Sequence, residues 1–202
     1  MIKIVTIFIC LFWTSCIVFA QTLAFPTAIG FGGYATGGRG GSVYHVTNLN
    51  DSGLGSFRDA VSVSNRIVVF DISGYIKIKS VIYVKSNITI AGQTAPGVGI
   101  GVIGSTVSFS NSSNIIVRYM RFRPGDASID LWKFDCGLDM PTAKNIILDH
   151  VSAELSQFDQ IAAMRDTNIT VQNSIIANPV GYNIGSLGSL KFLLEYVNTN
   201  NI

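Results

Sequence analysis

Short apolar runs, separated by Gly, Asn, Ser and Pro, dominate the chain from Arg66 onward. The runs are rich in Val, Ile, Thr and Phe, a composition typical of β-strands. An Asn followed by β-branched or aliphatic residues recurs, with a period mostly in the twenties, at Asn65, Asn87, Asn114, Asn145 and Asn168. A repeat of this kind, with no helical pattern between the strands, predicts an all-β solenoid of the parallel β-helix type, in which each coil buries its apolar face against the next.

The recurring Asn has a structural explanation. Asn tolerates a left-handed backbone and can bond its own main chain, which suits a sharp turn between two sheets. Asn side chains stacked at matching positions of successive coils are also expected to hydrogen-bond one another. The two longer intervals, from Asn87 to Asn114 and from Asn114 to Asn145, contain extra residues. These should leave the coil as loops on one face, where functional residues often lie.

The residues before the repeat predict an N-terminal cap. The glycine-rich stretch from Gly30 to Gly41 lacks a following Gly-Lys-Ser/Thr and a strand-then-helix context. We therefore expect an irregular segment folded over one end of the core rather than a phosphate-binding loop. Ser56 to Ser62 is helical in pattern, with Ser56 as N-cap and Phe57, Ala60 and Val61 on one face. The expected organisation is a signal peptide over 1–20, the cap over 21–65, coils over 66–178 and a divergent tail over 179–202.

The first twenty residues predict export. Lys3 precedes the apolar run Ile4–Phe19, and the small residue Ala20 precedes Gln21, as in a secretory signal peptide. The run is short for a membrane span, which needs ~20 apolar residues. We therefore expect a secreted protein with no membrane association after cleavage.

Cysteine content and charge limit the remaining possibilities. Cys136 is the one cysteine beyond the expected signal peptide, so no intramolecular disulfide is expected. A net charge of +2 is too small to indicate nucleic-acid binding. Sequons at Asn50, Asn87, Asn111 and Asn168 predict a glycoprotein if the host is eukaryotic.

Several blocks of the chain, in order, resemble the pectate lyases of polysaccharide lyase family 1. They are AFPTAIGFGGYATGGRGGSVYHVTNLNDSGLGSFRDAV, IVVFDISGYIKIKS, KSNITIAGQTAPG, NIIVRYMRFRPGD and NIILDHVS, and the resemblance runs from about Ala24 to Asn178. It implies a right-handed parallel β-helix, an acidic polysaccharide substrate (pectate, or polygalacturonate) and Ca²⁺ as cofactor.

The chemistry of the resembled family explains its acidic residues. β-Elimination removes the proton at C5 beside the substrate carboxylate, and a hard cation held by carboxylate oxygens makes that proton more acidic. The resemblance implies Asp135, Asp139 and Asp159 as the metal ligands, with Glu154 able to reach the same groove if it faces outward. Asp126 and Asp130 are further acidic candidates. For each carboxylate, an ordinary solvated turn role remains the alternative.

Basic residues supply the candidate contacts to an acidic polymer. Arg165 and Arg121 are the candidate substrate-binding cations. Strand alternation places Arg121 and Arg123 on one face together with Tyr119, with Arg118 on the other, although an ordinary outer-face pair is equally consistent. The Asp149-His150 pair is expected to be buried and hydrogen-bonded rather than catalytic.

Some family features have no counterpart here. Leu155 stands where related sequences often have Trp, and no Lys lies near Arg165. The family's catalytic Arg lies one or two coils beyond Ile175–Asn178, where the resemblance fades. The catalytic base is therefore unknown, and we expect a C-terminally truncated lyase with an incomplete active site. Two functions remain open: a calcium-dependent pectate lyase, and a non-catalytic polysaccharide-binding or structural β-helix protein.

Overall fold

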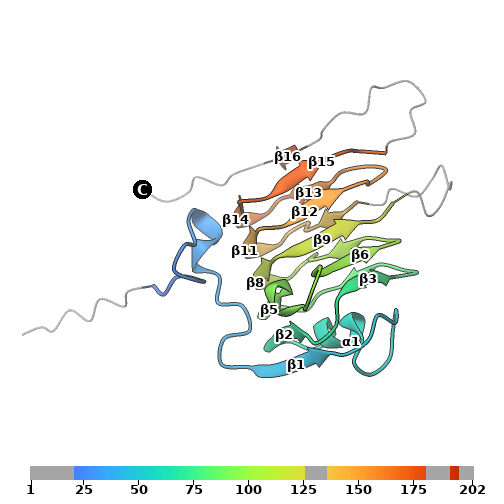
Figure 1. Ribbon diagram of the computed structural model, residues 1–202. Coiled ribbons are helices and arrows are strands. Elements are labelled where there is room, and N and C mark those ends of the chain that lie inside the picture. Colours follow the sequence, from blue (N-terminus) through green and yellow to red (C-terminus); the bar gives the residue numbers. More distant parts are fainter. Residues whose placement is uncertain (1–20, 126–135, 181–191, 196–202) are drawn as a thin grey trace, which may run out of the picture.

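The chain folds as a parallel β-helix with three sheets, seen side-on in a computed structural model (Figure 1) that describes residues 21–125, 136–180 and 192–195. Sheet A contains β1 (Ser42–Val46), β2 (Arg66–Phe70), β5 (Ile88–Ala91), β8 (Ser113–Arg118), β11 (Lys144–Asp149) and β14 (Thr167–Gln172). Sheet B contains β3 (Gly74–Lys77), β6 (Ile100–Ile103), β9 (Met120–Arg123), β12 (Ser152–Glu154) and β15 (Ile175–Ala177). Sheet C contains β4 (Ile82–Tyr83), β7 (Val107–Ser108), β10 (Leu138–Asp139), β13 (Ile161–Met164) and β16 (Phe192–Glu195). The predicted fold class is confirmed.

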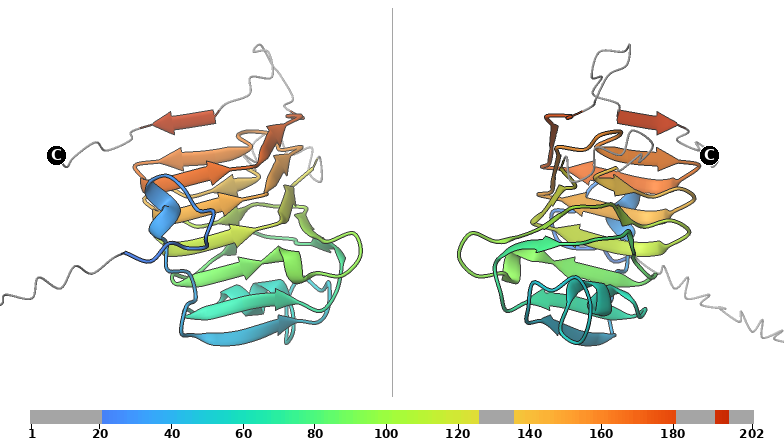
Figure 2. Two further views of the ribbon diagram at one scale, coloured as in Figure 1. Left: turned by 60° about the vertical axis from the view of Figure 1, so that its left-hand side comes forward. Right: turned by 90° about the vertical axis from the view of Figure 1, so that its right-hand side faces the viewer.

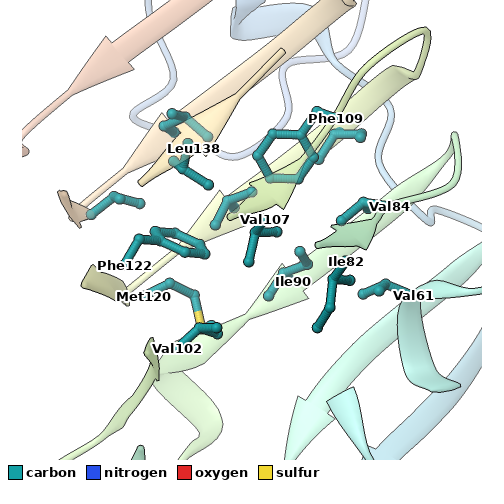
Figure 3. Close-up of a cluster of buried hydrophobic side chains, with 14 of the residues drawn as sticks. Val61, Ile82, Val84, Ile90, Val102, Val107, Phe109, Met120, Phe122 and Leu138 are labelled. Carbon is teal, nitrogen blue, oxygen red and sulfur yellow. The ribbon is translucent and has the colours of Figure 1, made fainter. Parts of the chain in front are cut away.

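One strand from each sheet makes a coil, and the coils stack along one axis, as the two views of Figure 2 show. The core is a column of inward side chains, among them Ile90, Val107, Phe109 and Phe122, each at most 1% exposed (Figure 3). Alternation along the short strands places every second side chain in this column. Because each layer rests on the layers above and below, burial is shared along the whole stack.

The predicted asparagine ladder is present at the turn from sheet C to sheet A. Asn87, Asn114, Asn145 and Asn168 all have positive φ, between 55° and 59°. Their side chains are linked in series: Asn114 Nδ2 donates to Asn87 Oδ1 (3.2 Å), Asn145 Nδ2 to Asn114 Oδ1 (3.3 Å) and Asn168 Nδ2 to Asn145 Oδ1 (2.8 Å). The ladder fixes the register of the coils, since a one-residue slip would break both the turn geometry and the bonds.

Substitutions at Asn145 separate the two roles of the ladder. Asn145→Gly keeps the left-handed turn but removes the side-chain hydrogen bonds to Asn114 and Asn168. We expect a loss of about 2 kcal/mol in the free energy of unfolding. Asn145→Ala adds the left-handed cost of a β-carbon and should lose about 1 kcal/mol more. Urea denaturation of both variants measures the difference, and equal losses would contradict a conformational role for this position.

The loops inserted into the coils leave from two corners rather than one face. Residues 92–99, including the 3₁₀ helix η2 (Gly92–Thr94), join β5 of sheet A to β6 of sheet B, whereas residues 124–137 join β9 of sheet B to β10 of sheet C. The prediction of a single loop-bearing face was therefore wrong, because the repeat length reports how many residues a coil has but not at which turn the extra ones leave.

The short helix is confirmed, as α1 (Phe57–Val61). Ser56 is the N-cap, and its side chain accepts a hydrogen bond from the backbone N–H of Asp59. Phe57 and Ala60 on its inner face are fully buried. The solenoid begins earlier than the repeat predicted, because β1, inside the expected cap, pairs in parallel with β2. No helix within the described part of the chain is long and apolar enough to cross a membrane; the expected signal peptide lies outside the described residues.

The glycine-rich segment covers the side of sheet A, not an end of the core as predicted. We call residues 27–41 the glycine strap; it contains the 3₁₀ helix η1 (Phe31–Tyr34) and lies beside β11 and β14 (Figure 1). Its backbone N–H groups donate to side chains that project from sheet A: Ile29 to Gln172, Gly32 to Thr170 and Gly38 to Thr89. The strap thus ties coils that are far apart in the sequence.

Glycine is required where the strap touches the sheet. A β-carbon on Gly38 would lie 1.9 Å from the carbonyl oxygen of Arg66, and one on Gly32 would lie 2.1 Å from that of Ile146. Ala28 and Ala35 of the strap bury small side chains against Ile116 and Ile147 in a second, minor core. Only small residues allow two backbones to approach this closely.

Candidate functional site

The outer face of sheet B carries the charged residues of the candidate site. Met120 and Phe122 of β9 point into the core, so the alternate residues Arg121 and Arg123 point outward. Beside them on β12, Ser152 and Glu154 flank the buried Ala153, and Ser152 pairs in register with Arg121. Two arginines, a hydroxyl and a carboxylate therefore share one patch of surface.

Arg123 is fully engaged within this patch. Its guanidinium donates to Glu154 Oε1 at 2.7 Å, to Ser152 Oγ at 3.2 Å and to the Tyr75 hydroxyl. Asn178 Nδ2 donates to the other oxygen of Glu154 at 3.1 Å. The bond from Arg123 holds the pKa of Glu154 below its usual value. Glu154 faces outward, which meets the condition set for its reaching the groove, but its charge is paired with that of Arg123.

Arg121 is differently placed. Its guanidinium carbon lies 4.9 Å from the centre of the Tyr75 ring, a cation–π contact. Gly101 lies between their strands, and a β-carbon there would be 2.7 Å from the Tyr75 ring and 3.1 Å from Arg121 Cβ, so the missing side chain allows the contact. The Nη2 atom of Arg121 is buried and has no hydrogen-bond partner. This arginine keeps an unused donor.

A groove of about 430 Å³ with both polar and apolar lining runs along the corner between sheets A and B. One wall is the loop that contains Gly97 and Gly99, and the other includes Arg121, Ser152 and three turn residues, Tyr119, His150 and Asn173. We call this space, lined by those residues, the corner groove.

The three turn residues occupy equivalent places in successive coils. Tyr119, His150 and Asn173 have φ of 55°, 53° and 49°, and the Tyr119 and His150 rings stack with centroids 4.5 Å apart. The predicted face shared by Tyr119 and Arg121 was wrong, because the left-handed turn at Tyr119 interrupts strand alternation. Neither Tyr119 nor His150 was predicted as a site residue. The sequence pattern could have identified them, because each of the three turn residues follows an asparagine of the ladder at the same distance along the chain.

Asp149 is the centre of a buried network below this corner. Its carboxylate, 0% exposed, accepts hydrogen bonds from Arg118 Nε (2.8 Å), Gln172 Nε2 (2.9 Å), Asn173 Nδ2 (3.0 Å) and His150 Nδ1 (3.1 Å). Burial by itself raises the pKa of this carboxyl, but the four hydrogen bonds outweigh it and lower the pKa to about 2. The expected buried, hydrogen-bonded role is confirmed for Asp149 but is wrong for His150, whose side chain is 43% exposed.

The same network holds the glycine strap in place. Gln172 Nε2 also donates to the carbonyl oxygen of Thr27 (3.2 Å), while Gln172 Oε1 accepts from the N–H of Ile29 (3.1 Å). The guanidinium of Arg118 lies 4.1 Å from the centre of the Phe25 ring. The buried carboxylate therefore connects the corner of sheets A and B to the N-terminal segment.

The predicted metal ligands are not all within the described part of the chain. Asp135 lies outside it, as do Asp126 and Asp130. Asp139 is in β10 of sheet C, where burial raises the pKa of its carboxyl and a hydrogen bond from Ser108 offsets part of the rise. Asp159 is buried just before β13, and its backbone oxygen accepts from the N–H of Gly137.

The described carboxylates do not by themselves form a metal site. Over residues 21–125 and 136–180, no group of three or more His, Cys, Asp or Glu could hold a metal ion. Calcium takes 6–8 oxygen ligands, which two of the three predicted aspartates cannot supply alone. A calcium site that uses Asp139 and Asp159 would therefore need further oxygen ligands, such as Asp135, from outside the described residues.

The two predicted substrate-binding arginines lie apart in the fold. Arg165 is exposed at a left-handed turn (φ 59°) from β13 of sheet C to β14 of sheet A, whereas Arg121 is on sheet B. Sequence spacing could not separate them, because a position along the repeat does not say which sheet it faces. Of the pair, Arg121 lines the corner groove.

A second buried acid lies near Asp139. Asp166 is 8% exposed, and its Oδ1 accepts from the N–H of Ala143 at 2.7 Å while Oδ2 has no partner. Burial raises the pKa of Asp166 to about 6; hydrogen bonds from backbone N–H groups oppose the rise and the charge of Asp139 adds to it.

The raised pKa of Asp166 predicts a pH dependence of stability. The folded state keeps this proton up to about pH 6, whereas the unfolded chain loses it near 3.8, so the folded state binds more protons between these values. The contribution of Asp166 to stability should therefore decline as pH rises from 3.8 to about 6, and level off above. Asp166→Asn should remove that decline in urea unfolding measured across this range, and an unchanged pH profile would contradict the assignment.

Comparisons with known proteins agree on one family, although no protein-family model matches the chain. The chain is 50% identical over 169 residues to probable pectate lyase C of Aspergillus fumigatus, covering 83% of this chain and 39% of that protein. Probable pectate lyase C of Emericella nidulans is 50% identical over 173 residues, with the same coverage. The chain is a homologue of the pectate lyases.

Two more distant matches were found, one in sequence and one in structure. Probable pectate lyase 6 of Arabidopsis thaliana is 29% identical over 164 residues, covering 72% of this chain and 36% of that protein. The crystal structure of Jun a 1, the major allergen from cedar pollen, superposes with a TM-score of 0.61 at 22% identity, covering 71% of this chain and 47% of that one, which supports the fold alone. The chain spans about 39% of the length of the fungal pectate lyases it matches.

Proposed function

We propose that this chain is part of a secreted pectate lyase-like protein that acts on polygalacturonate by calcium-assisted β-elimination. The observation that carries the proposal is 50% identity over 169 residues to fungal proteins named probable pectate lyase C. A shared fold alone would not support a shared function, because one fold hosts many unrelated functions. Sequence identity at this level goes beyond a shared fold and therefore supports the proposal.

The outer face of sheet B is the proposed polymer-binding surface. Arg121 supplies positive charge for an anionic uronate chain, whereas the charge of Arg123 is paired with Glu154. Arg165 is a more remote basic candidate on another corner. In this proposal Asp135, Asp139 and Asp159 contribute to calcium binding, with Asp135 outside the described residues. Calcium held there would supply Lewis-acid chemistry, which would neutralise a substrate carboxylate and acidify the adjacent C–H. The catalytic base is not assigned to a residue of this chain.

The test is the formation of unsaturated uronate, measured by its ultraviolet absorbance, when the folded chain is mixed with polygalacturonate. A signal that requires calcium and disappears with a chelator is the expected result for a lyase. Folded chain that binds polygalacturonate with no product, with or without calcium, would overturn the catalytic part of the proposal.

A second candidate function is non-catalytic binding of an acidic polysaccharide. It is favoured by the engagement of Glu154, whose carboxylate is paired with Arg123 at 2.7 Å. Polymer binding that is indifferent to chelation distinguishes this function from the first.

A further inference from the structure

The glycine strap spans sheet A from its last described strand to its first. At one end Gly32 N–H donates to Thr170 Oγ1 of β14 at 2.9 Å, and further along Gly38 N–H donates to Thr89 Oγ1 of β5 at 3.0 Å. The strap then leads directly into β1 at Ser42, the other edge of the sheet (Figure 1). One extended segment therefore contacts coils that otherwise touch only their neighbours.

The strap packs on a small core that is separate from the central column of the coils. Ala28 and Ala35 contact Ile116 and Ile147 on the outer face of sheet A. Among the described residues, the central apolar core contains none from the strap. The coils therefore keep their main core when the strap is away from the sheet.

The strap itself buries little apolar surface. Its largest apolar side chains, Ile29 and Phe31, are 66% and 67% exposed. It is held instead by alanines and by hydrogen bonds from its backbone to side chains of sheet A. Segments with few buried apolar contacts open at a lower free energy than the core of a protein. We therefore expect the strap to open while the coils stay intact.

The order of the chain constrains when the strap docks. Gly32 and its acceptor Thr170 are 138 residues apart, and Ile29 and its acceptor Gln172 are 143 apart. Contacts between such distant residues have a large loop-closure cost unless the intervening chain is already folded. Stacking of the coils from β2 to β14 brings the two ends together, so docking should follow stacking.

We propose that the glycine strap is a latch that closes last in folding, opens first and moves as one unit. When closed, it ties β14 to the first strands of sheet A, so a coil between them cannot leave the sheet unless the strap is released. Stacks whose coils contact only their neighbours open piecemeal, and the latch makes this stack cooperative. When open, it exposes Ile116 and Ile147 without disturbing the central column.

Hydrogen exchange of the folded chain, followed by NMR at low urea concentrations, tests the opening of the latch. After correction for intrinsic rates, the amides of Ile29, Gly32 and Gly38 should exchange with one common opening free energy. They should exchange faster, by about tenfold or more, than the amides of Phe109 and Met140, which donate to backbone oxygens of the next coil. Equal rates for strap and coil amides would overturn the proposal.

Thr170→Val shows whether the strap moves as one unit. It should accelerate exchange about tenfold at Gly32, which loses its acceptor, and equally at Gly38, which keeps its own bond to Thr89. Thr167→Val is the matched control, because Thr167 lies on the same strand and its side chain has no hydrogen bond within the described residues; it should leave both rates unchanged. Acceleration confined to Gly32 would contradict a single unit.

Thr89→Val is the reciprocal variant, and it covers the case in which Thr170→Val disturbs β14 itself. It removes the acceptor of Gly38 and should accelerate exchange at Gly32 by the same factor. An unchanged rate at Gly32 would count against the latch.

Refolding from urea with pulses of hydrogen exchange tests the order of closure. The amides of Phe109 and Met140 should become protected first, and those of Gly32 and Gly38 later. Strap amides that are protected before the coil amides, or together with them, would show that the strap does not close last.

Discussion

Replacing Asp149 by Ala is expected to lower the free energy of unfolding by about 4 kcal/mol, because removing one member of a buried ion pair strands its partners. The carboxylate is 0% exposed and accepts from four side chains. Without it, Arg118 loses its ion-pair partner, and the strap loses the carboxylate that orients Gln172. Urea denaturation at neutral pH measures the loss.

Asp71→Ala is the matched control for the Asp149 substitution. Asp71 Oδ1 lies 2.9 Å from His45 Nδ1 at the surface, where both side chains are more than half exposed. Exposed ion pairs contribute little, so its removal should change stability by roughly 1 kcal/mol or less. Similar losses in the two variants would contradict a central role for the buried network.

The pKa of Asp149 adds a pH signature to this prediction. The carboxyl titrates at about 2 in the folded state and near 3.8 when unfolded, so the unfolded state binds more protons between these values. The stabilisation is fully present above pH 3.8 and is lost as pH falls toward 2. Asp149→Asn should remove this loss of stability at acid pH. The pH dependence from Asp149 is opposite in sign to that from Asp166, whose contribution to stability declines as pH rises.

Replacing Gly38 by Ala should destabilise the protein by about 3 kcal/mol, because the added methyl overpacks a contact between two backbones. The new carbon would lie 1.9 Å from the carbonyl oxygen of Arg66 and 2.3 Å from its carbon. No rotamer change relieves a clash with backbone, so the strap must move away from sheet A. Proteolysis within residues 27–41 should accelerate in parallel with the loss seen in urea denaturation.

Gly40→Ala serves as the control within the same strap. Gly40, unlike Gly38, has a positive φ, and no atom lies within 4 Å of the added carbon. Only the left-handed backbone cost of about 1 kcal/mol therefore applies. A Gly40 variant as unstable as the Gly38 variant would mean that backbone conformation, rather than close approach, explains the glycines of the strap.

The sequence determined the coil and its repeat. Asn recurring before β-branched runs predicted both the solenoid and the hydrogen-bonded ladder from Asn87 to Asn168. The N-cap at Ser56 was equally predictable. These features depend on local backbone preference and on side-chain alternation, and both can be read from neighbouring residues. The family resemblance came from the same contiguous blocks.

Only the tertiary structure decided which sheet each residue faces. The left-handed turn at Tyr119 moves that ring to the corner, while Arg121, two residues later, stays on the face of sheet B. Arg165, predicted as a partner in substrate binding, lies on a different turn. Alternation holds along a strand but is reset at each corner, so the outcome depends on the number of residues in each turn.

The glycine strap and the corner groove were likewise decided by long-range contacts. Gly32 approaches Ile146 and Gly38 approaches Arg66 because the coils stack, not because of any neighbour in the sequence. Arg123 pairs with Glu154 of the next coil, whereas Nη2 of Arg121 has no partner. Sequence determines which groups a coil presents, whereas the stacking of coils decides which of them are satisfied and which remain available to a ligand.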